Sequence, residues 1–346
     1  MPHVKTSIRC NALWKKKNNF MIGDRLPLAL ETGGLTVPEG RIAVFHPAID
    51  ANLRGLPQAQ CEVIQPFRPA YDAFKAAGFA CAVQPSERYV LSVICLPRAK
   101  SEARALVAQA AACTDGPIII DGQKTDGVDS IFKSLRQRAD VSSTISKAHG
   151  KLFWINSHDG LEDWMEHPAL TDGGFWTAPG VFSADGVDAG SELLAQALPV
   201  KLGKNVADLG AGWGYLSAHA LTRDINELHL VEAGYMALEC AKRNITDERA
   251  QHHWADATKW APKGRIDTVI MNPPFHVSRA AEPSLGQAFV ATAARILANS
   301  GQLWMVANRH LPYEESLNAN FGKVTDLGGD ARFKLFHAAR PLRKRA

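Results

Sequence analysis

The chain has 346 residues, of which 46% are hydrophobic and 21% charged, and Lys and Arg outnumber Asp and Glu by 39 to 35. This composition excludes a disordered chain, a collagen-like repeat and a coiled coil. No apolar run reaches the roughly 18 residues that a membrane span needs. At about 150 residues per domain, the length predicts two domains.

The charge is unevenly distributed along the chain. Residues 1–20 carry five bases and no acid, residues 331–346 carry six bases and no acid, and residues 21–330 hold 28 bases and 35 acids. We therefore expect an acidic body with two basic ends, each either a solvated tail or a contact for a polyanion. Residues 1–20 lack a signal-peptide core, and we expect a poorly ordered tail or a non-native start before Met21.

The cysteines and histidines indicate no metal site. The six cysteines form no CxxC motif, which is typical of reduced thiols in a cytoplasmic protein. His252, His253 and Asp256 are explained more simply as the end of a strand than as metal ligands. We therefore predict a cytoplasmic protein without a metal.

In residues 21–150, apolar runs rich in β-branched residues alternate with Ala-rich helical stretches. This alternation predicts βαβ units and a parallel sheet. The expected strands are residues 41–46, 61–66, 79–83, 89–96 and 117–120, and the clearest helices are 100–113 and 126–138.

Residues 151–346 repeat the scheme. After an irregular lead-in at 174–190, Ser191 is expected to cap a short helix over 192–197. Strands are expected at 205–209, 227–231, 251–255, 266–271 and 301–307, helices at 214–222, 234–244 and 285–298, and a closing hairpin at 323–327 and 332–338. The predicted fold is α/β with two tandem Rossmann-like domains, the second built on a seven-stranded, mostly parallel sheet.

A weak internal repeat supports duplication. Val93-Ile94 before Leu96-Pro97 resembles Val269-Ile270 before Asn272-Pro273. The first half has no glycine cluster after its first strand and no Asn-Pro-Pro-Phe. The first domain is therefore interpreted as a degenerate duplicate.

The strongest local motif joins a strand to a helix through Asp208-Leu209-Gly210-Ala211-Gly212-Trp213-Gly214. Glycines let the backbone turn sharply and approach a ligand, and the helix start adds free N–H groups. A dinucleotide fingerprint would need its third glycine at Tyr215, so the spacing disfavours a nicotinamide-dependent dehydrogenase. The motif instead resembles the first motif of S-adenosylmethionine-dependent methyltransferases. This resemblance implies that Gly210, Ala211, Gly212 and Gly214 bind the cofactor, with Asp208 near its amino group.

Two further acids end the next two strands. Glu232 lies 22 residues after Gly210, where a carboxylate can bind ribose hydroxyls. Asp256, followed by Ala257, stands where methyltransferases contact the adenine amine. Either acid alone is also explained as a cap or a turn residue, but three acids at three successive strand ends favour a cofactor site.

The next motif is Asn272-Pro273-Pro274-Phe275-His276, directly after a strand. Asn-Pro is ordinarily a stiff turn, but at this strand it resembles the motif of exocyclic-amine methyltransferases. The Asn272 oxygen and the Pro273 carbonyl can each accept one N–H bond from a planar amine and orient its lone pair. Phe275 offers a stacking face for a flipped base. Asn272, Pro273 and Phe275 are the predicted catalytic residues, Asn272 also borders the cofactor, and Pro274, Phe275 and His276 contact substrate.

Together with the two motifs above, three further stretches carry a family resemblance. They are Phe182-Ser183-x-Asp185-Gly186-x-Asp188-x-Gly190-Ser191, Val306-Ala307-Asn308-x-x-Leu311-Pro312-Tyr313 and Gly122-Gln123-Lys124-Thr125-Asp126-Gly127. Over residues 21–340 the chain resembles bacterial small-subunit ribosomal RNA guanine-N2 methyltransferases of the RsmC type. The resemblance implies S-adenosylmethionine as donor, guanine N2 in ribosomal RNA as acceptor, and two methyltransferase-like domains of which only the second binds cofactor.

Two departures from that family affect substrate binding. Trp213 is bulkier than usual between the glycines, so we expect it to reshape the cofactor entrance. Residues 151–330 hold 14 bases and 22 acids, whereas residues 21–150 hold 14 bases and 13 acids. We therefore expect the first domain and the basic ends to dock the ribosomal RNA or small subunit, with the protein acting as a monomer.

Other functions share part of this pattern. Asn-Pro-Pro-aromatic also serves methyltransferases of other planar amines, namely a large-subunit ribosomal guanine, adenine N6 in DNA and a protein glutamine. A non-catalytic RNA-binding assembly protein is the alternative of another class, and the intact Asp208, glycine loop and Asn272 disfavour it.

Overall fold

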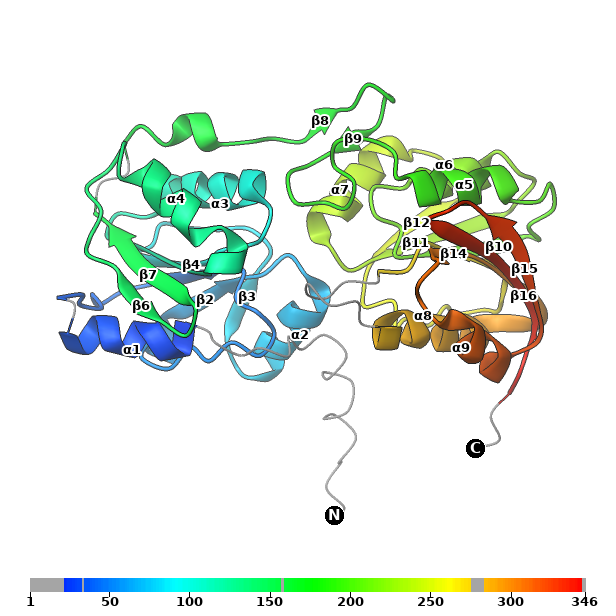
Figure 1. Ribbon diagram of the computed structural model, residues 1–346, viewed down its shortest axis with the longest axis horizontal. Helices are drawn as coiled ribbons and strands as arrows, with labels where there is room; N and C mark the ends of the chain where they lie inside the picture. Colours follow the sequence, from blue (N-terminus) through cyan, green and yellow to red (C-terminus); the bar gives the residue numbers. More distant parts are fainter. Residues whose placement is uncertain (1–21, 33, 157–158, 275–282, 344–346) are drawn as a thin grey trace, which may run out of the picture. The chain divides into compact units, whose positions relative to one another are not determined.

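The computed structural model describes residues 22–32, 34–156, 159–274 and 283–343 (Figure 1). The chain divides into two compact units, Met1–His167 and Pro168–Ala346, and each contains a seven-stranded sheet. The boundary expected at residue 150 falls inside the first sheet, because β7 (Gly150–Ile155) pairs antiparallel with β5 (Ile118–Gln123).

The first unit has the strand order β3-β2-β1-β4-β5-β7-β6. The expected strands and the two helices with predicted bounds are present, and α2 is one of the helical stretches expected between strands, whereas β6, β7 and α1 were not expected. The remaining bounds are β1 (Ile42–Phe45), β2 (Cys61–Ile64), β3 (Ala80–Ala82), β4 (Leu91–Cys95), β6 (Ile145–Lys147), α1 (Ile22–Thr32), α2 (Arg68–Ala76), α3 (Lys100–Cys113) and α4 (Val128–Leu135).

The core of the first unit lies on both faces of its sheet. Figure 1 shows α1 and α2 on one face and α3 and α4 on the other. The central strands are buried on both sides and therefore read as continuous apolar runs. One ion pair lies within this core, where Arg25 Nε is 2.6 Å from Asp121 Oδ1.

The second unit repeats the strand order as β12-β11-β10-β13-β14-β16-β15. All neighbours are parallel except β16, which is antiparallel to both β14 and β15. The bounds are β10 (Asn205–Leu209), β11 (Glu227–Glu232), β12 (Ala250–Trp254), β13 (Ile266–Met271), β14 (Leu297–Asn308), β15 (Phe321–Gly329), β16 (Phe333–Pro341), α5 (Ala189–Ala197), α6 (Tyr215–Leu221), α7 (Tyr235–Asn244), α8 (Pro283–Ile296) and α9 (Tyr313–Asn320). The shared strand order confirms the predicted duplication of an α/β fold.

Three details of the second unit differ from the sequence prediction. α5 begins at Ala189, because Asp188 rather than Ser191 is its N-cap and accepts the Ser191 N–H at 2.8 Å. Within the lead-in expected to be irregular, β9 (Trp176–Thr177) forms a short sheet with β8 (Ala169–Leu170), which precedes it. The α9 helix was not expected.

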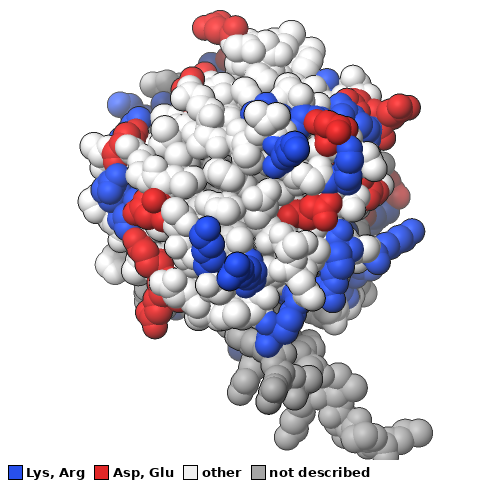
Figure 2. All heavy atoms as spheres, turned by 90° about the vertical axis from the view of Figure 1, so that its right-hand side faces the viewer, with Lys and Arg blue, Asp and Glu red and all other residues white. Residues whose placement is uncertain are grey.

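The basic C-terminal end is partly used within the fold. Lys334 pairs with Glu314, and the Arg343 guanidinium donates to the carbonyls of Ala294 and Leu297 near the end of α8. Arg332 and Arg340 are exposed. On the face in Figure 2, Lys and Arg side chains gather toward the right and lower parts around an uncharged centre.

Among the described residues, no helix is both long and apolar enough to cross a membrane.

Candidate cofactor and active site

The glycine loop between β10 and α6 has a backbone that favours glycine at three positions. Gly210, Gly212 and Gly214 have φ angles of 76°, 56° and 94°. At Gly214 a Cβ would also lie 3.1 Å from a side-chain carbon of Ile245. The Gly210 N–H donates to the carbonyl of Val231 at 2.9 Å, which fixes the loop against the end of β11.

Asp208 lies beneath this loop and is fully buried. Its Oδ2 accepts a hydrogen bond from the Ser217 hydroxyl at 2.8 Å, which ties β10 to the first turns of α6. Its Oδ1 has no hydrogen-bond partner among the residues that the structure describes. Burial raises the pKa of Asp208 to about 7. A buried carboxylate with an unsatisfied oxygen suits a site that binds a cation.

Glu232 braces the loop from the end of β11. Its Oε2 accepts the Gly212 N–H at 2.8 Å, and its Oε1 accepts the Gly234 N–H at 2.7 Å. Burial raises the pKa of Glu232, while these N–H bonds act in the opposite direction. The carboxylate therefore holds the turn that ribose hydroxyls were expected to approach.

Asp256 and Ala257 follow β12 and form a turn. Asp256 Oδ1 accepts the backbone N–H and the hydroxyl of Thr258, at 2.9 and 2.6 Å, and Oδ2 lies 3.5 Å from Lys259 Nζ. Both Asp256 and Ala257 are buried. Their expected contact with adenine stays a prediction.

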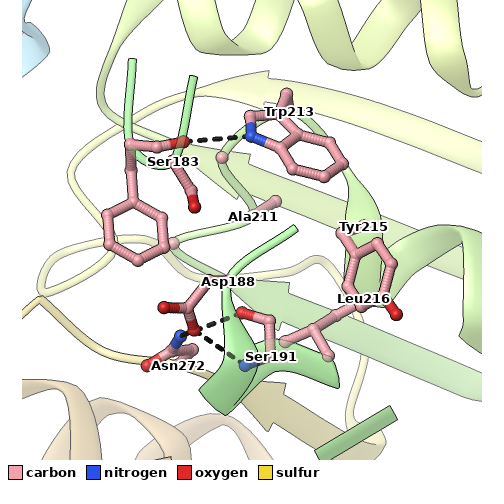
Figure 3. Close-up of a pocket in the computed structure, with 11 residues that line it drawn as sticks. Ser183, Asp188, Ser191, Ala211, Trp213, Tyr215, Leu216 and Asn272 are labelled. Atoms are coloured by element: carbon pink, nitrogen blue, oxygen red, sulfur yellow. Dashed lines mark hydrogen bonds between the residues drawn. The ribbon is translucent and has the colours of Figure 1, made fainter. Parts of the chain in front are cut away.

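Asn272 directly follows β13 and is partly exposed. Its Nδ2 donates to Asp188 Oδ2 at 3.0 Å and to the Ser191 hydroxyl at 2.9 Å. Figure 3 shows the amide nitrogen turned toward Asp188 and the amide oxygen turned away from it. Pro273 is buried and Pro274 is partly exposed, whereas Phe275 and His276 lie outside the described residues.

A pocket opens between these groups (Figure 3) and holds about 380 Å³ of space, part of it open to solvent. Among the residues predicted from the sequence, Gly210, Ala211, Gly212 and Asn272 line it; Asp208, Gly214, Glu232 and Asp256 do not. The other lining residues were not predicted as site residues, and they are Phe182, Ser183, Asp188, Ser191, Trp213, Tyr215 and Leu216. The motif from Phe182 to Ser191 was the sequence signal for four of them.

Trp213 anchors the segment that forms the pocket wall. Its side chain is buried, packs at 5.0 Å between ring centroids against Phe175, and donates its indole N–H to the Phe182 carbonyl at 3.0 Å. Asn244 adds hydrogen bonds to both Trp176 and the Trp213 carbonyl. Trp213 thus acts on the pocket by holding Phe182 and Ser183 at its edge.

The first unit lacks the polar groups of this site at equivalent positions of its sheet. The His46 N–H donates to the Ile64 carbonyl at 3.0 Å, and this hydrogen bond is equivalent to the one from the Gly210 N–H to the Val231 carbonyl in the second unit. The residue after Ile64 is Gln65 and the residue after Val231 is Glu232, so Gln65 occupies the place of Glu232. Gln65 Nε2 donates to the Pro47 carbonyl at 2.8 Å, where Glu232 accepts from Gly212.

The same strand register identifies the counterparts of the other two polar groups. Val44 occupies the place of Asp208, and Cys95 rather than the expected Leu96 occupies the place of Asn272. The first unit therefore keeps the topology of the site without its carboxylates or its amide.

Comparison with known proteins agrees with this geometry. A family model described as "Methyltransferase small domain" matches residues 172–337. The small-subunit ribosomal RNA methyltransferase C of Hahella chejuensis is 31% identical over 242 residues, covering 63% of this chain and 68% of that protein. The enzyme of the same name from Shewanella sp. MR-7 is 29% identical and covers 87% of this chain and 94% of that protein.

A solved structure has the same two-unit fold. It is the T. thermophilus 16S rRNA N2 G1207 methyltransferase (RsmC) in complex with AdoMet and guanosine. The TM-score is 0.77 at 24% identity, with 94% of this chain and 93% of that chain covered. By sequence and fold, the chain belongs to the ribosomal RNA small subunit methyltransferase C family.

Proposed function

We propose that this protein transfers a methyl group from S-adenosylmethionine to the exocyclic N2 amine of a guanine in small-subunit ribosomal RNA. The observation that carries the proposal is one pocket lined by both the glycine loop and Asn272. Membership of the methyltransferase C family supports the donor and the class of acceptor. We further propose that the protein acts as a monomer in the cytoplasm, where its substrate is found.

The residues around the loop fit a cationic, nucleoside-containing cofactor. The loop offers close backbone approach at Gly210 and Gly212, and Asp208 supplies a buried negative charge behind it. Glu232 and Asp256 stand at the next two strand ends for the ribose and the base, as the sequence predicts. When bound, S-adenosylmethionine supplies an electrophilic methyl group on a positively charged sulfur.

The residues after β13 fit a planar amine. The lone pair of such a nitrogen is delocalised, so the amine is a weak nucleophile until it is oriented. Asn272 Oδ1 and the Pro273 carbonyl are acceptors for its two N–H groups, and proline limits the movement of both. No strong base is required, because the nitrogen becomes acidic once alkylated. Phe275 remains the predicted stacking residue.

The first expected outcome concerns the product. Purified small ribosomal subunits and naked ribosomal RNA are incubated with the protein and isotope-labelled S-adenosylmethionine, and digested nucleosides are identified by mass spectrometry. We expect labelled N2-methylguanosine. Labelled N6-methyladenosine or methylglutamine would replace this proposal with one of the other planar-amine functions.

Asn272→Ala is expected to lower the rate constant of methyl transfer by at least about 100-fold, because orientation of the amine by preorganised acceptors is lost. The cofactor dissociation constant, measured by calorimetry, should change little. The matched control is Asn318→Ala on the exposed face of α9, which should keep the normal rate. A normal rate in Asn272→Ala would show that the amine is held by other groups.

The cofactor affinity is expected to rise with pH. Since the pKa of Asp208 is raised to about 7, the group is mostly neutral at pH 6 and mostly ionised at pH 8. A cationic ligand favours the ionised form, so the dissociation constant should fall about tenfold across that interval. Asp208→Asn should bind more weakly at pH 8 and lose most of the pH dependence. An equal pH dependence in both proteins would assign the titration to another group.

We also propose that the first unit and the basic ends supply most phosphate contacts, and that the first unit is a docking and structural module. Support comes from the charge excess of residues 1–20 and from the missing site groups in the first unit. The exposed Arg332 and Arg340 would add phosphate contacts from the second unit.

This docking proposal predicts the salt dependence of RNA binding. Changing the five bases of residues 1–20 to glutamine should flatten the plot of log affinity against log salt concentration, by up to about 0.7–0.9 per lost phosphate contact. The matched control changes five exposed bases of the second unit, Lys201, Lys204, Lys242, Lys263 and Arg265. If the control flattens the plot as much, the N-terminal bases have no special role.

A further inference from the structure

Asp188 contacts both the start of a helix and Asn272 at the edge of the pocket. Its Oδ2 accepts the Ser191 backbone N–H at 2.8 Å and the Asn272 Nδ2 group at 3.0 Å. Ser191 completes the arrangement, since its hydroxyl oxygen lies 2.9 Å from the same Nδ2. The three side chains surround one edge of the pocket in Figure 3.

The hydrogen-bonding chemistry of Asp188 and Ser191 determines which way the Asn272 amide faces. Nδ2 carries two N–H groups, and the two contacts engage both of them. A hydroxyl can either donate or accept, so Ser191 alone would tolerate the amide in both orientations. A carboxylate only accepts, and a reversed amide would bring two oxygens together at Asp188. Asp188 is therefore the group that discriminates between the two orientations.

Asp188 is itself held in place. As the N-cap of α5 it lies at the positive end of the helix, which favours its charge. The helix is anchored by the buried Leu194 and Ala195. The helix also packs closely against β16 at Gly190, where a Cβ would lie only 2.9 Å from the Phe333 ring. The same Cβ would lie 3.0 Å from Asp188 Oδ2, so the carboxylate has little room to move on this side. The carboxylate is thus a fixed reference for the amide.

We propose that Asp188 is a positioning residue that locks the Asn272 amide with Nδ2 inward and Oδ1 presented to the amine of the acceptor base. This inference rests on the proposed function, because the use of Oδ1 requires an amine substrate. The locked orientation itself is a property of the free protein and can be measured separately.

The exchange of the two side chains tests the proposal. Asp188→Asn offers the amide a partner that can also donate, and we expect the single-turnover rate at saturating cofactor and RNA to fall about 10- to 100-fold. Asn272→Asp places two carboxylates side by side and should also lose activity.

In the double variant D188N/N272D, the amide introduced at position 188 can donate to one oxygen of the carboxylate introduced at position 272, which leaves the second oxygen as acceptor. We expect the double variant to be at least about tenfold faster than N272D. A double variant no faster than N272D would overturn the proposal.

A readout without catalysis separates this proposal from the proposed function. Solvent exchange of the Asn272 side-chain N–H groups, followed by NMR on asparagine-labelled protein, should be slow in the native protein and at least about tenfold faster in D188N. Glu192→Gln is the matched control, because it removes one charge from the exposed face of the same helix turn. It should leave exchange and rate unchanged.

The outcomes are then distinct. Unchanged exchange in D188N would overturn the positioning role, whatever the enzyme methylates. If the Asn272 N–H groups exchange slowly in the native protein and faster in D188N, the positioning role stands. If the native protein then forms a product other than N2-methylguanosine, only the proposed acceptor is overturned.

Discussion

The site depends on the place of β10 in the second sheet. Its partners are β11 on one side and β13 on the other, both parallel to it. From β10 the chain adds β11 and β12 on one side and then returns to add β13 and β14 on the other, so the strand order reverses at β10. A crevice forms at the carboxyl ends of strands where this reversal occurs. Glu232 and Asn272 are 40 residues apart, and each comes to this edge because its own strand pairs with β10. That pairing brings Asp208, Glu232 and Asn272 to one edge, whereas Asp188 and Ser191 reach the pocket from the start of α5.

The first unit shows that this topology alone does not make the site. Its β1 has the same two parallel neighbours, yet Val44, Gln65 and Cys95 stand where the second unit has Asp208, Glu232 and Asn272. Burying a carboxylate is costly, as the raised pKa of Asp208 reflects. Val44 has no charge to bury, and the Gln65 amide has its hydrogen-bond partner within the protein, the Pro47 carbonyl. The neutral set in the first unit avoids the cost of burying a carboxylate at the same positions.

Features that depend on short stretches of sequence were predictable, and features that depend on distant contacts were not. Buried parallel strands read as apolar runs, and the glycine loop and Asn-Pro-Pro mark their own turns, so the fold class and the place of Asn272 could be inferred from the sequence. Asp188 contacts Asn272 across 84 positions and Trp213 contacts Phe182 across 31, so neither role has a local signal. The carboxylates of Glu232 and Asp256 bond to nearby backbone N–H groups, which periodicity cannot reveal.

The uneven charge of the sequence has a physical meaning in this arrangement. A sulfonium cofactor and a polyanionic RNA require opposite fields, which one uniform charge cannot provide. The carboxyl groups of the fully buried Asp208 and the partly exposed Glu232 lie behind the glycine loop, and burial limits the screening of Asp208 when it is ionised. The excess of bases over acids lies at the two ends of the chain, where residues 1–20 and 331–346 hold eleven bases and no acid, and we propose that these bases act on phosphates at longer range. The net charge of +4 is therefore the sum of an acidic body and two basic ends, which under this proposal face different ligands.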